Sequence, residues 1–469
     1  MRTTRIFYAS TLFGATTLAA ALDSGCFGPA DRRLLVVADN AAVPETTAAL
    51  DEMPGFEGLR GRFDAVLSWN EAISPLHPAG WTPRADDLPL LERHLRLLWG
   101  LGDDRLELAL ESVQVTPALT LARLFPDAAL DVYADGLMSY GPTRNKIEPL
   151  VGERVRRLLH LDLVPGLAPL LLAEYGVRAT VVPTEAFTKV VAELAETSGD
   201  VAGAEGAAGT AAGAGAEPGA GAASPAGAGG SAGAGEEDGP ALLLGQYLAA
   251  LSLLTPAEEE ELHLRMVRGA IARGHRRLAF KPHPTAPDAW TRSLALEAER
   301  LGAELTVLDR PVLAEVLYRE LRPALVVGCF STGLFTARAF YGIPVARVGT
   351  RTLLARLTPY QNSNRVPVTL ADALLPDLEE DAPGRVPEAE DLAGLVAAVG
   401  FAMQPKIRPD LRDAAVRHLS GPLAERTRHH FTRRRLTVLG LPGGLPVPRH
   451  PRVRRLARHA LRLKRALSR

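Results

Sequence analysis

The 469-residue chain is interrupted near its middle by a segment, residues 198–240, that consists almost entirely of alanine and glycine. Side chains this small cannot bury enough apolar surface to offset the entropy that a segment loses when it becomes ordered. We therefore expect a disordered linker here. Each flanking part is long enough for an ordinary domain of about 150 to 200 residues. The sequence thus predicts two folded parts joined by a linker.

The part before the linker alternates short apolar runs with helical segments. The apolar runs predict strands at residues 5–10, 34–38, 63–69, 106–110, 130–133, 156–161 and 179–182. Apolar strands separated by helices are typical of a parallel sheet that is covered on both faces. The first residues resemble a signal peptide superficially, but polar residues such as Ser10 and Thr11 interrupt the apolar run. A first strand followed by a helix that ends near Gly25 is the favoured interpretation.

The part after the linker repeats this alternation. Strands are predicted at residues 241–244, 277–280, 304–308, 324–327 and 345–348, and helices at 256–273, 288–302, 312–320 and 334–341. The predicted fold is α/β, with two Rossmann-like doubly wound domains at 1–197 and 241–422 that face a central cleft, and a basic helical tail at 423–469. Ligands of such sheets bind at the carboxyl ends of the strands.

Charge and cysteine content exclude several classes of protein. The formal net charge is -1, so the chain as a whole carries no field that would attract nucleic acid. The two cysteines, Cys26 and Cys329, form no disulfide framework and no metal-binding Cys-x-x-Cys pair. A reducing compartment fits this usage best, and no stretch of about 18 apolar residues is present to span a membrane.

The strongest local motif is Lys281-Pro282-His283-Pro284, directly after a predicted strand. A histidine at this edge can donate to a leaving phosphate, either as imidazolium or as a neutral N–H donor. The alternative is a turn that ends the strand and carries a surface histidine. The competing pair His77-Pro78 lies in a proline-rich loop instead of at a strand end.

A second motif, Gly328-Cys329-Phe330-Ser331-Thr332-Gly333, joins a predicted strand to a helix. Small residues allow close approach of a ligand, and the hydroxyl and free N–H groups at a helix N-terminus bind anions. Ser331 or Thr332 could equally serve only as the helix cap. The sequence lacks the Gly-Lys-Ser/Thr of a P-loop.

A third motif, Tyr133-Ala134-Asp135-Gly136, follows a strand of the first part. Asp135 is a candidate general base, although an Asp-Gly turn explains the pattern as well. Further candidates lie at other strand ends, near a helix start or in the loop beyond Asp135, and each alone also fits a structural role. They are Asn70, Glu111, Gln114, Arg144, Gly245, Gln246 and Glu315.

Together these segments resemble the bacterial alpha-2,8-polysialyltransferase family. The resemblance is carried by residues 133–143, 280–284 and 328–333 and covers most of both parts. It implies the GT-B arrangement, with an acceptor-side first domain and a second domain that binds a nucleotide sugar. It also implies an inverting transfer of sialic acid, or a related nonulosonic acid, from a CMP-activated donor to a glycan hydroxyl. Neither a metal nor a cofactor is expected.

The resemblance assigns roles residue by residue. Asp135 would be the general base, and His283 would stabilise and protonate the departing CMP. Ser331 and Thr332 would hold the phosphate. The other predicted donor-side residues are Lys281, Pro284, Gly333, Glu315, Gly245 and Gln246, and the acceptor-side residues are Asn70, Glu111, Gln114, Gly136 and Arg144. One departure is Ala134, where many relatives have a second carboxylate, which puts the substrate detail in doubt.

Two other functions remain open. The same fold serves transferases and epimerases that use UDP- or GDP-sugars, because function depends on the site and not on the fold. A non-catalytic membrane-associated binding protein is the second alternative.

The last residues form a predicted basic amphipathic helix. From Arg452 onward, apolar residues recur every three or four positions among arginines and lysines. Such a helix can pack on the first domain or dock on anionic lipid. Docking would place a cytoplasmic enzyme at the inner face of the cell membrane, near a glycan or lipid-linked glycan acceptor of polysaccharide or capsule synthesis.

Overall fold

The computed structural model describes residues 1–134, 136–199, 239–246, 248–283, 287–380 and 388–445. The predicted linker, apart from its ends, and the predicted basic helix of the tail lie outside the described residues. So do Asp135 and Pro284.

The first part contains a seven-stranded sheet in which every adjacent pair of strands is parallel. Its strands are β1 (Thr3–Ala9), β2 (Arg32–Val37), β3 (Ala65–Ser68), β4 (Arg105–Glu111), β5 (Ala129–Tyr133), β6 (Val155–Leu161) and β7 (Arg178–Val182). The spatial order is β3-β2-β1-β4-β5-β6-β7, so the order reverses between β1 and β4. Ile6 is the register partner of both Leu34 and Leu108, and all three are buried.

The second part contains a five-stranded parallel sheet. Its strands are β8 (Ala241–Leu244), β9 (Arg277–Lys281), β10 (Glu304–Val307), β11 (Leu325–Gly328) and β12 (Val345–Arg347). The order β10-β9-β8-β11-β12 reverses between β8 and β11, which repeats the topology of the first sheet. Both sheets are therefore Rossmann-like, and the predicted two-domain GT-B-like α/β fold is confirmed.

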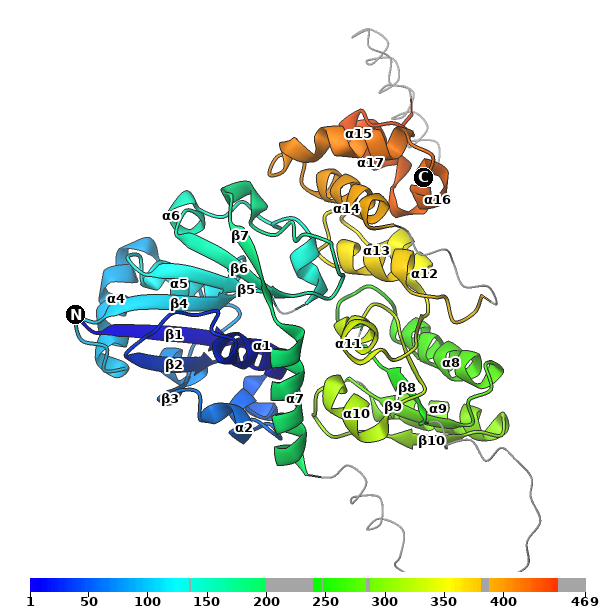
Figure 1. The fold of residues 1–469 in the computed structure, drawn as a ribbon, viewed down its shortest axis with the longest axis horizontal. Helices are drawn as coiled ribbons and strands as arrows, with labels where there is room; N and C mark the ends of the chain where they lie inside the picture. The colour runs from blue at the N-terminus through cyan, green and yellow to red at the C-terminus, as the bar shows by residue number, and fades with distance from the viewer. Residues whose placement is uncertain (135, 200–238, 247, 284–286, 381–387, 446–469) are drawn as a thin grey trace, which may run out of the picture.

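Helices cover both sheets, as Figure 1 shows. In the first part they are α1 (Leu12–Asp23), α2 (Glu57–Arg60), α3 (Trp69–Ile73), α4 (Leu88–Leu98), α5 (Ala118–Leu124), α6 (Pro149–Gly152) and α7 (Thr184–Ser198). Those of the second part are α8 (Pro256–Ala272), α9 (Asp288–Arg300), α10 (Ala314–Leu321) and α11 (Thr332–Tyr341). Thr255 starts α8 with a capping box to Glu258, which satisfies backbone N–H groups at this end. None of the described helices is long and apolar enough to cross a bilayer.

Further helices follow the second sheet. They are α12 (Thr350–Arg356), α13 (Arg365–Leu374), α14 (Ala389–Met403), α15 (Arg412–Ser420), α16 (Ala424–Thr427) and α17 (Arg433–Leu439). Only the sequence beyond residue 422 was expected to be helical in this region, so α12 to α15 are additions to the prediction. In Figure 1 they continue from the second sheet past the end of the first domain.

Two bridges connect the domains. The first is α7, which packs on α1 of its own domain and on α10 of the other. Phe187 of α7 meets Phe340 of α11 edge to face, with ring centroids 5.7 Å apart. The second bridge is α14, where Gly400 lies against Leu170 and Pro142 of the first domain. The described parts of the two domains thus pack together at both ends of their interface (Figure 1).

Candidate functional site

The second and third sequence motifs meet across the interface between the domains. Gly136 follows β5 of the first domain, and Thr332 begins α11 of the second. A methyl group on the Gly136 Cα would lie 2.6 Å from Thr332 Oγ1, so the two residues are in direct contact. Gly136 also has a φ of 151°, which side-chain-bearing residues rarely adopt. The interface therefore requires glycine here, next to the predicted base Asp135, which itself lies outside the described residues.

The loop 328–333 leads from β11 into the N-terminus of α11. Ser331 caps α11, and its hydroxyl accepts a hydrogen bond from Gly333 N at 3.2 Å. The Gly333 carbonyl accepts from the hydroxyl of Tyr318 at 2.9 Å. Gln246 Oε1 accepts from the backbone N–H of Phe330 at 3.0 Å, which fixes the loop to the end of β8. The half-buried hydroxyls of Ser331 and Thr332 stand at the positive end of the helix dipole.

Gly333 and Gly245 are glycines because neighbouring atoms leave no room for a side chain. A methyl group on Gly333 would lie 2.8 Å from the Tyr318 hydroxyl. One on Gly245 would lie 3.0 Å from the Phe280 ring and 3.1 Å from the Lys281 carbonyl. Gly245 N also donates to that carbonyl at 2.9 Å. The ends of β8 and β9 are therefore drawn together beside the helix start.

Lys281 and His283 leave the end of β9. Burial lowers the pKa of Lys281, while the carboxylate of Glu315 opposes this change. Partial burial of the ring and the charge of Lys281 both lower the pKa of His283, although its side chain as a whole remains exposed. At neutral pH, without a bound anion, His283 is therefore a neutral N–H donor. Pro284, which completes the motif, lies outside the described residues.

Glu315 does not lie at the ligand-accessible surface. Its side chain is buried within α10 packing and accepts a hydrogen bond from Thr336 Oγ1. Burial raises the pKa of Glu315, which the hydrogen bond from Thr336 and the charge of Lys281 oppose. The sequence suggested a direct donor contact for Glu315, whereas the structure makes it a buried partner of Lys281.

A polar cluster lies on the first domain where the strand order reverses. The carboxylate of Glu111, at the end of β4, accepts from both the backbone N–H and the hydroxyl of Ser10, each at 2.9 Å. The Tyr133 hydroxyl lies 3.3 Å from the same carboxylate and donates to the Tyr8 carbonyl at 3.0 Å. The sequence identified Glu111 but not Ser10 or Tyr133, although both end predicted strands of this sheet. Ligands of open α/β sheets bind at such reversal points.

Ala134 does not contribute a charge to this edge. It is 3% exposed and packs in the apolar cluster that includes Val132 and Leu110. A carboxylate at this position would enter that cluster. Glu111 is the residue that places a carboxylate beside Tyr133, its register partner on β5.

Three predicted acceptor-side residues are engaged by the protein itself. Asn70 accepts from Asp39 N and donates to Asp39 O, both at 3.0 Å, and so joins two strand ends. Gln114 accepts from the backbone N–H of Arg144. Arg144 donates to Ser363 Oγ at 2.6 Å and thereby links the first domain to the segment before α13. Of the three, Arg144 reaches the second domain, while Asn70 and Gln114 hold segments of the first domain together.

A cavity of about 290 Å³ lies elsewhere, between α8 and α12. Its lining is mostly apolar. Arg356 and Glu258 also line it and form an ion pair, with Arg356 Nη1 2.5 Å from Glu258 Oε2. None of the predicted site residues lines this cavity. This cavity therefore lies apart from the converging strand ends that make up the candidate site.

Comparison with known proteins gives one family and several distant structures. The family model described as "Alpha-2,8-polysialyltransferase (POLYST)" matches residues 5–350. A search of curated proteins finds no significant match.

Among solved structures, UDP-GlcNAc 2-epimerase from Methanocaldococcus jannaschii is 12% identical, with a TM-score of 0.42 over 81% of this chain and 94% of that one. MurG from Acinetobacter baumannii is 10% identical, with a TM-score of 0.39 over 91% and 98%. UGT2 from Phytolacca americana, without ligand, is 10% identical, with a TM-score of 0.40 over 93% and 98%.

Proposed function

This chain belongs to the alpha-2,8-polysialyltransferase family and is a glycosyltransferase, and we propose that it transfers sialic acid or a related nonulosonic acid from a CMP-activated donor to a glycan hydroxyl. The observation that carries the proposal is the contact of Gly136 with Thr332. It brings the acidic motif of the acceptor side against the hydroxyl motif of the donor side, as a transfer between two substrates requires.

On the donor side, the proposed task is to hold the CMP phosphate and to stabilise charge as it leaves. Ser331, Thr332 and the N-terminal N–H groups of α11 bind the phosphate oxygens. Lys281 adds positive charge, and His283 donates a hydrogen bond to the departing phosphate. Because bound phosphate is an anion, it raises the pKa of His283 again, so that protonation of the leaving group becomes accessible.

On the acceptor side, the proposed general base is Asp135. A carboxylate that takes the acceptor proton lowers the barrier for attack on the oxocarbenium-like donor sugar. The attack comes from the face opposite CMP, so the transfer inverts the anomeric centre. Lys281, His283 and the helix N-terminus supply the positive charge, so the proposed reaction is independent of a metal or cofactor.

A thermal-shift screen tests the donor class. CMP and CMP-sialic acid are expected to raise the melting temperature of the protein, while UDP and GDP leave it unchanged. Asp135→Asn should retain the CMP response and lose transfer, because the amide keeps the shape of the side chain but cannot accept the proton. Stabilisation by UDP or GDP would instead establish a UDP- or GDP-sugar enzyme, and no response to any nucleotide would favour a non-catalytic binding protein.

The basic tail is proposed to dock on an anionic membrane, where lipid-linked glycan is at hand. Each lysine or arginine near such a surface contributes about 1 kcal/mol. Deletion of residues 451–469 is therefore expected to abolish co-sedimentation with phosphatidylserine-containing liposomes. Neutral liposomes serve as the control, and neither the full chain nor the shortened chain is expected to co-sediment with them. Unchanged co-sedimentation of the shortened chain with the anionic liposomes would remove this role.

A further inference from the structure

Two adjacent histidines and an aspartate meet behind the second sheet. Asp372 belongs to α13, while His429 and His430 end the short helix η7 (Arg428–His430). His429 Nε2 lies 2.6 Å from Asp372 Oδ2, and His430 Nε2 lies 3.5 Å from the same oxygen. One ligand atom from each residue falls within 4.8 Å of the other two. None of the predicted site residues belongs to this cluster.

His430 is almost fully buried, with a side chain that is 2% exposed, and its Nδ1 has no hydrogen-bond partner among the described residues. Its other ring nitrogen, Nε2, faces Asp372 Oδ2 and is the one available to the cluster.

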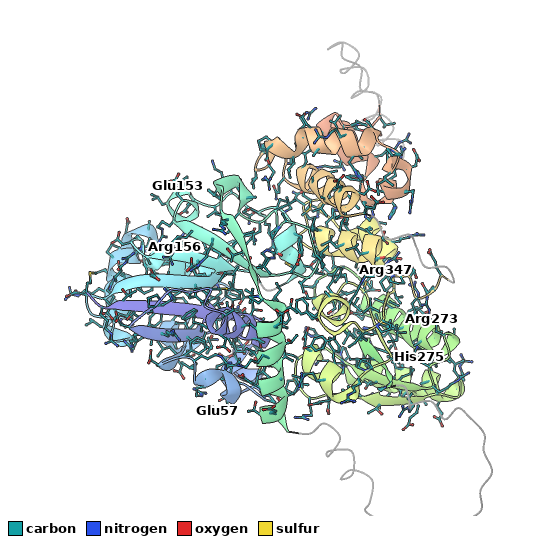
Figure 2. All side chains as sticks on the ribbon, in the orientation of Figure 1. Glu57, Glu153, Arg156, Arg273, His275 and Arg347 are labelled. Atoms are coloured by element: carbon teal, nitrogen blue, oxygen red, sulfur yellow. The ribbon has the colours of Figure 1, made fainter. Side chains whose placement is uncertain are left out.

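The aspartate is held so that one oxygen faces the histidines. Asp372 Oδ1 accepts from Thr350 Oγ1 at 2.7 Å and lies 3.2 Å from Arg347 Nη2, which leaves Oδ2 for the imidazoles. Arg347, labelled in Figure 2, also pairs with Asp377 at 2.6 Å. Asp372 and Asp377 thus both pair with this guanidinium. Such outer partners orient metal-binding side chains in proteins.

We infer that Asp372, His429 and His430 form a site for a divalent transition-metal ion, with Zn²⁺ as the ion of choice. Two imidazole nitrogens and one carboxylate oxygen are typical zinc ligands, and a water molecule completes four-coordination. Zinc bonds of about 2.0 to 2.2 Å require the ligand atoms to stand a little over 3 Å apart. The distance between His430 and Asp372 already fits, and the more exposed His429 ring has room to move outward.

The ion would fasten the last described helices to the second domain. The His430 carbonyl accepts from the Tyr360 hydroxyl at 3.0 Å, so η7 already touches the segment before α13. A metal bond from α13 to η7 would add a second connection between segments that are 57 residues apart. The inferred role is structural and does not depend on the proposed donor chemistry.

Metal binding to the untagged full chain tests the inference. After removal of metal with a chelator, titration with Zn²⁺ is expected to show one equivalent bound tightly. The melting temperature should rise by about 5 °C at a hundredfold excess over the dissociation constant. Co²⁺ in the same site should give the strong visible absorption of a four-coordinate ion.

His429→Ala is the decisive variant, because His429 is the more exposed histidine, and Asp372 Oδ2 keeps His430 Nε2 as a neighbour at 3.5 Å when it is removed. It is expected to lose the bound equivalent, the cobalt spectrum and the thermal shift, while its response to CMP stays that of the wild type. His94→Ala, at an exposed histidine of α4, should bind as the wild type does. Binding that persists in His429→Ala, or a wild type that binds no stoichiometric Zn²⁺, would overturn the inference.

Discussion

His283→Ala is expected to lower kcat by about 10² to 10³-fold, because it removes the donor that stabilises the departing CMP. His283 follows the end of β9, close enough to Lys281 for the charge of that lysine to lower the pKa of the ring. Its loss should affect the transition state more than ground-state binding, since charge develops on the phosphate only as the bond breaks. Steady-state kinetics with CMP-sialic acid and a sialylated acceptor measure the effect, with KM expected to change only a few-fold.

The chain supplies a matched control in its other His-Pro pair. His77 precedes Pro78, and its Nε2 lies 3.0 Å from the Ala41 carbonyl in the first domain. His77→Ala therefore removes the same side chain from the same dipeptide without touching the donor side. An equal loss in both variants, or a kcat for His283→Ala within twofold of the wild type, would refute the role assigned to His283.

The pH profile separates the two forms in which His283 can act. Its pKa lies below the usual value of 6.5 because of partial burial and Lys281. If the free enzyme must carry imidazolium, kcat/KM falls as pH rises through that lowered pKa. If a neutral N–H donor suffices, kcat/KM has no such limb, and His283→Gln retains part of the activity that His283→Ala loses.

Much of the fold could be predicted because the strands are buried on both faces. Runs such as Leu34–Val37 and Leu242–Leu244 are continuously apolar, and each lies within a strand of the structure. Helix α7 was not predicted, although the sequence contains its pattern. Its buried residues Phe187, Val190, Val191 and Leu194 follow helical spacing. The helices α12 to α15 were not predicted, although the buried residues Leu392, Leu395, Val396 and Val399 of α14 also follow helical spacing.

From the sequence, only those residues of the candidate site that directly follow predicted strands could be identified. The residues after β8, β9 and β11 lie near one another because parallel strands deliver their carboxyl ends to one edge. The burial of Glu315 and the contacts of Ser10 with Glu111 depend on residues far away in sequence. The same holds for Asp372 and His429, which no spacing rule connects.

The contact between the two domains depends on a residue with no side chain. The proposed phosphate binding on α11 and the proposed proton removal next to β5 are useful only when both occur on one pair of substrates. Gly136 allows this because it has no Cβ, which would lie only 2.6 Å from Thr332 Oγ1. The site is therefore sensitive to added volume at a position that carries no chemistry of its own.

Gly136→Ala is accordingly expected to lower kcat/KM by about 10²-fold or more, since a displacement of about 1 Å between reacting groups costs that much. The added methyl group would meet Thr332 Oγ1 at 2.6 Å and push the domains apart. The unusual backbone conformation adds a stability cost of about 1 to 3 kcal/mol. Transfer kinetics and thermal unfolding, measured together, separate the two effects.

The matched control is Gly166→Ala, in the same domain. Gly166 also has a positive φ, 81°, but a methyl group there meets nothing within 4 Å. It should therefore lose stability through backbone strain while its kcat/KM stays within about threefold of the wild type, since the interface between the domains is untouched. If both variants lose activity in proportion to their stability, backbone strain alone explains Gly136. If Gly136→Ala loses transfer while remaining folded and still responding to CMP, close approach of the two domains is what the reaction requires.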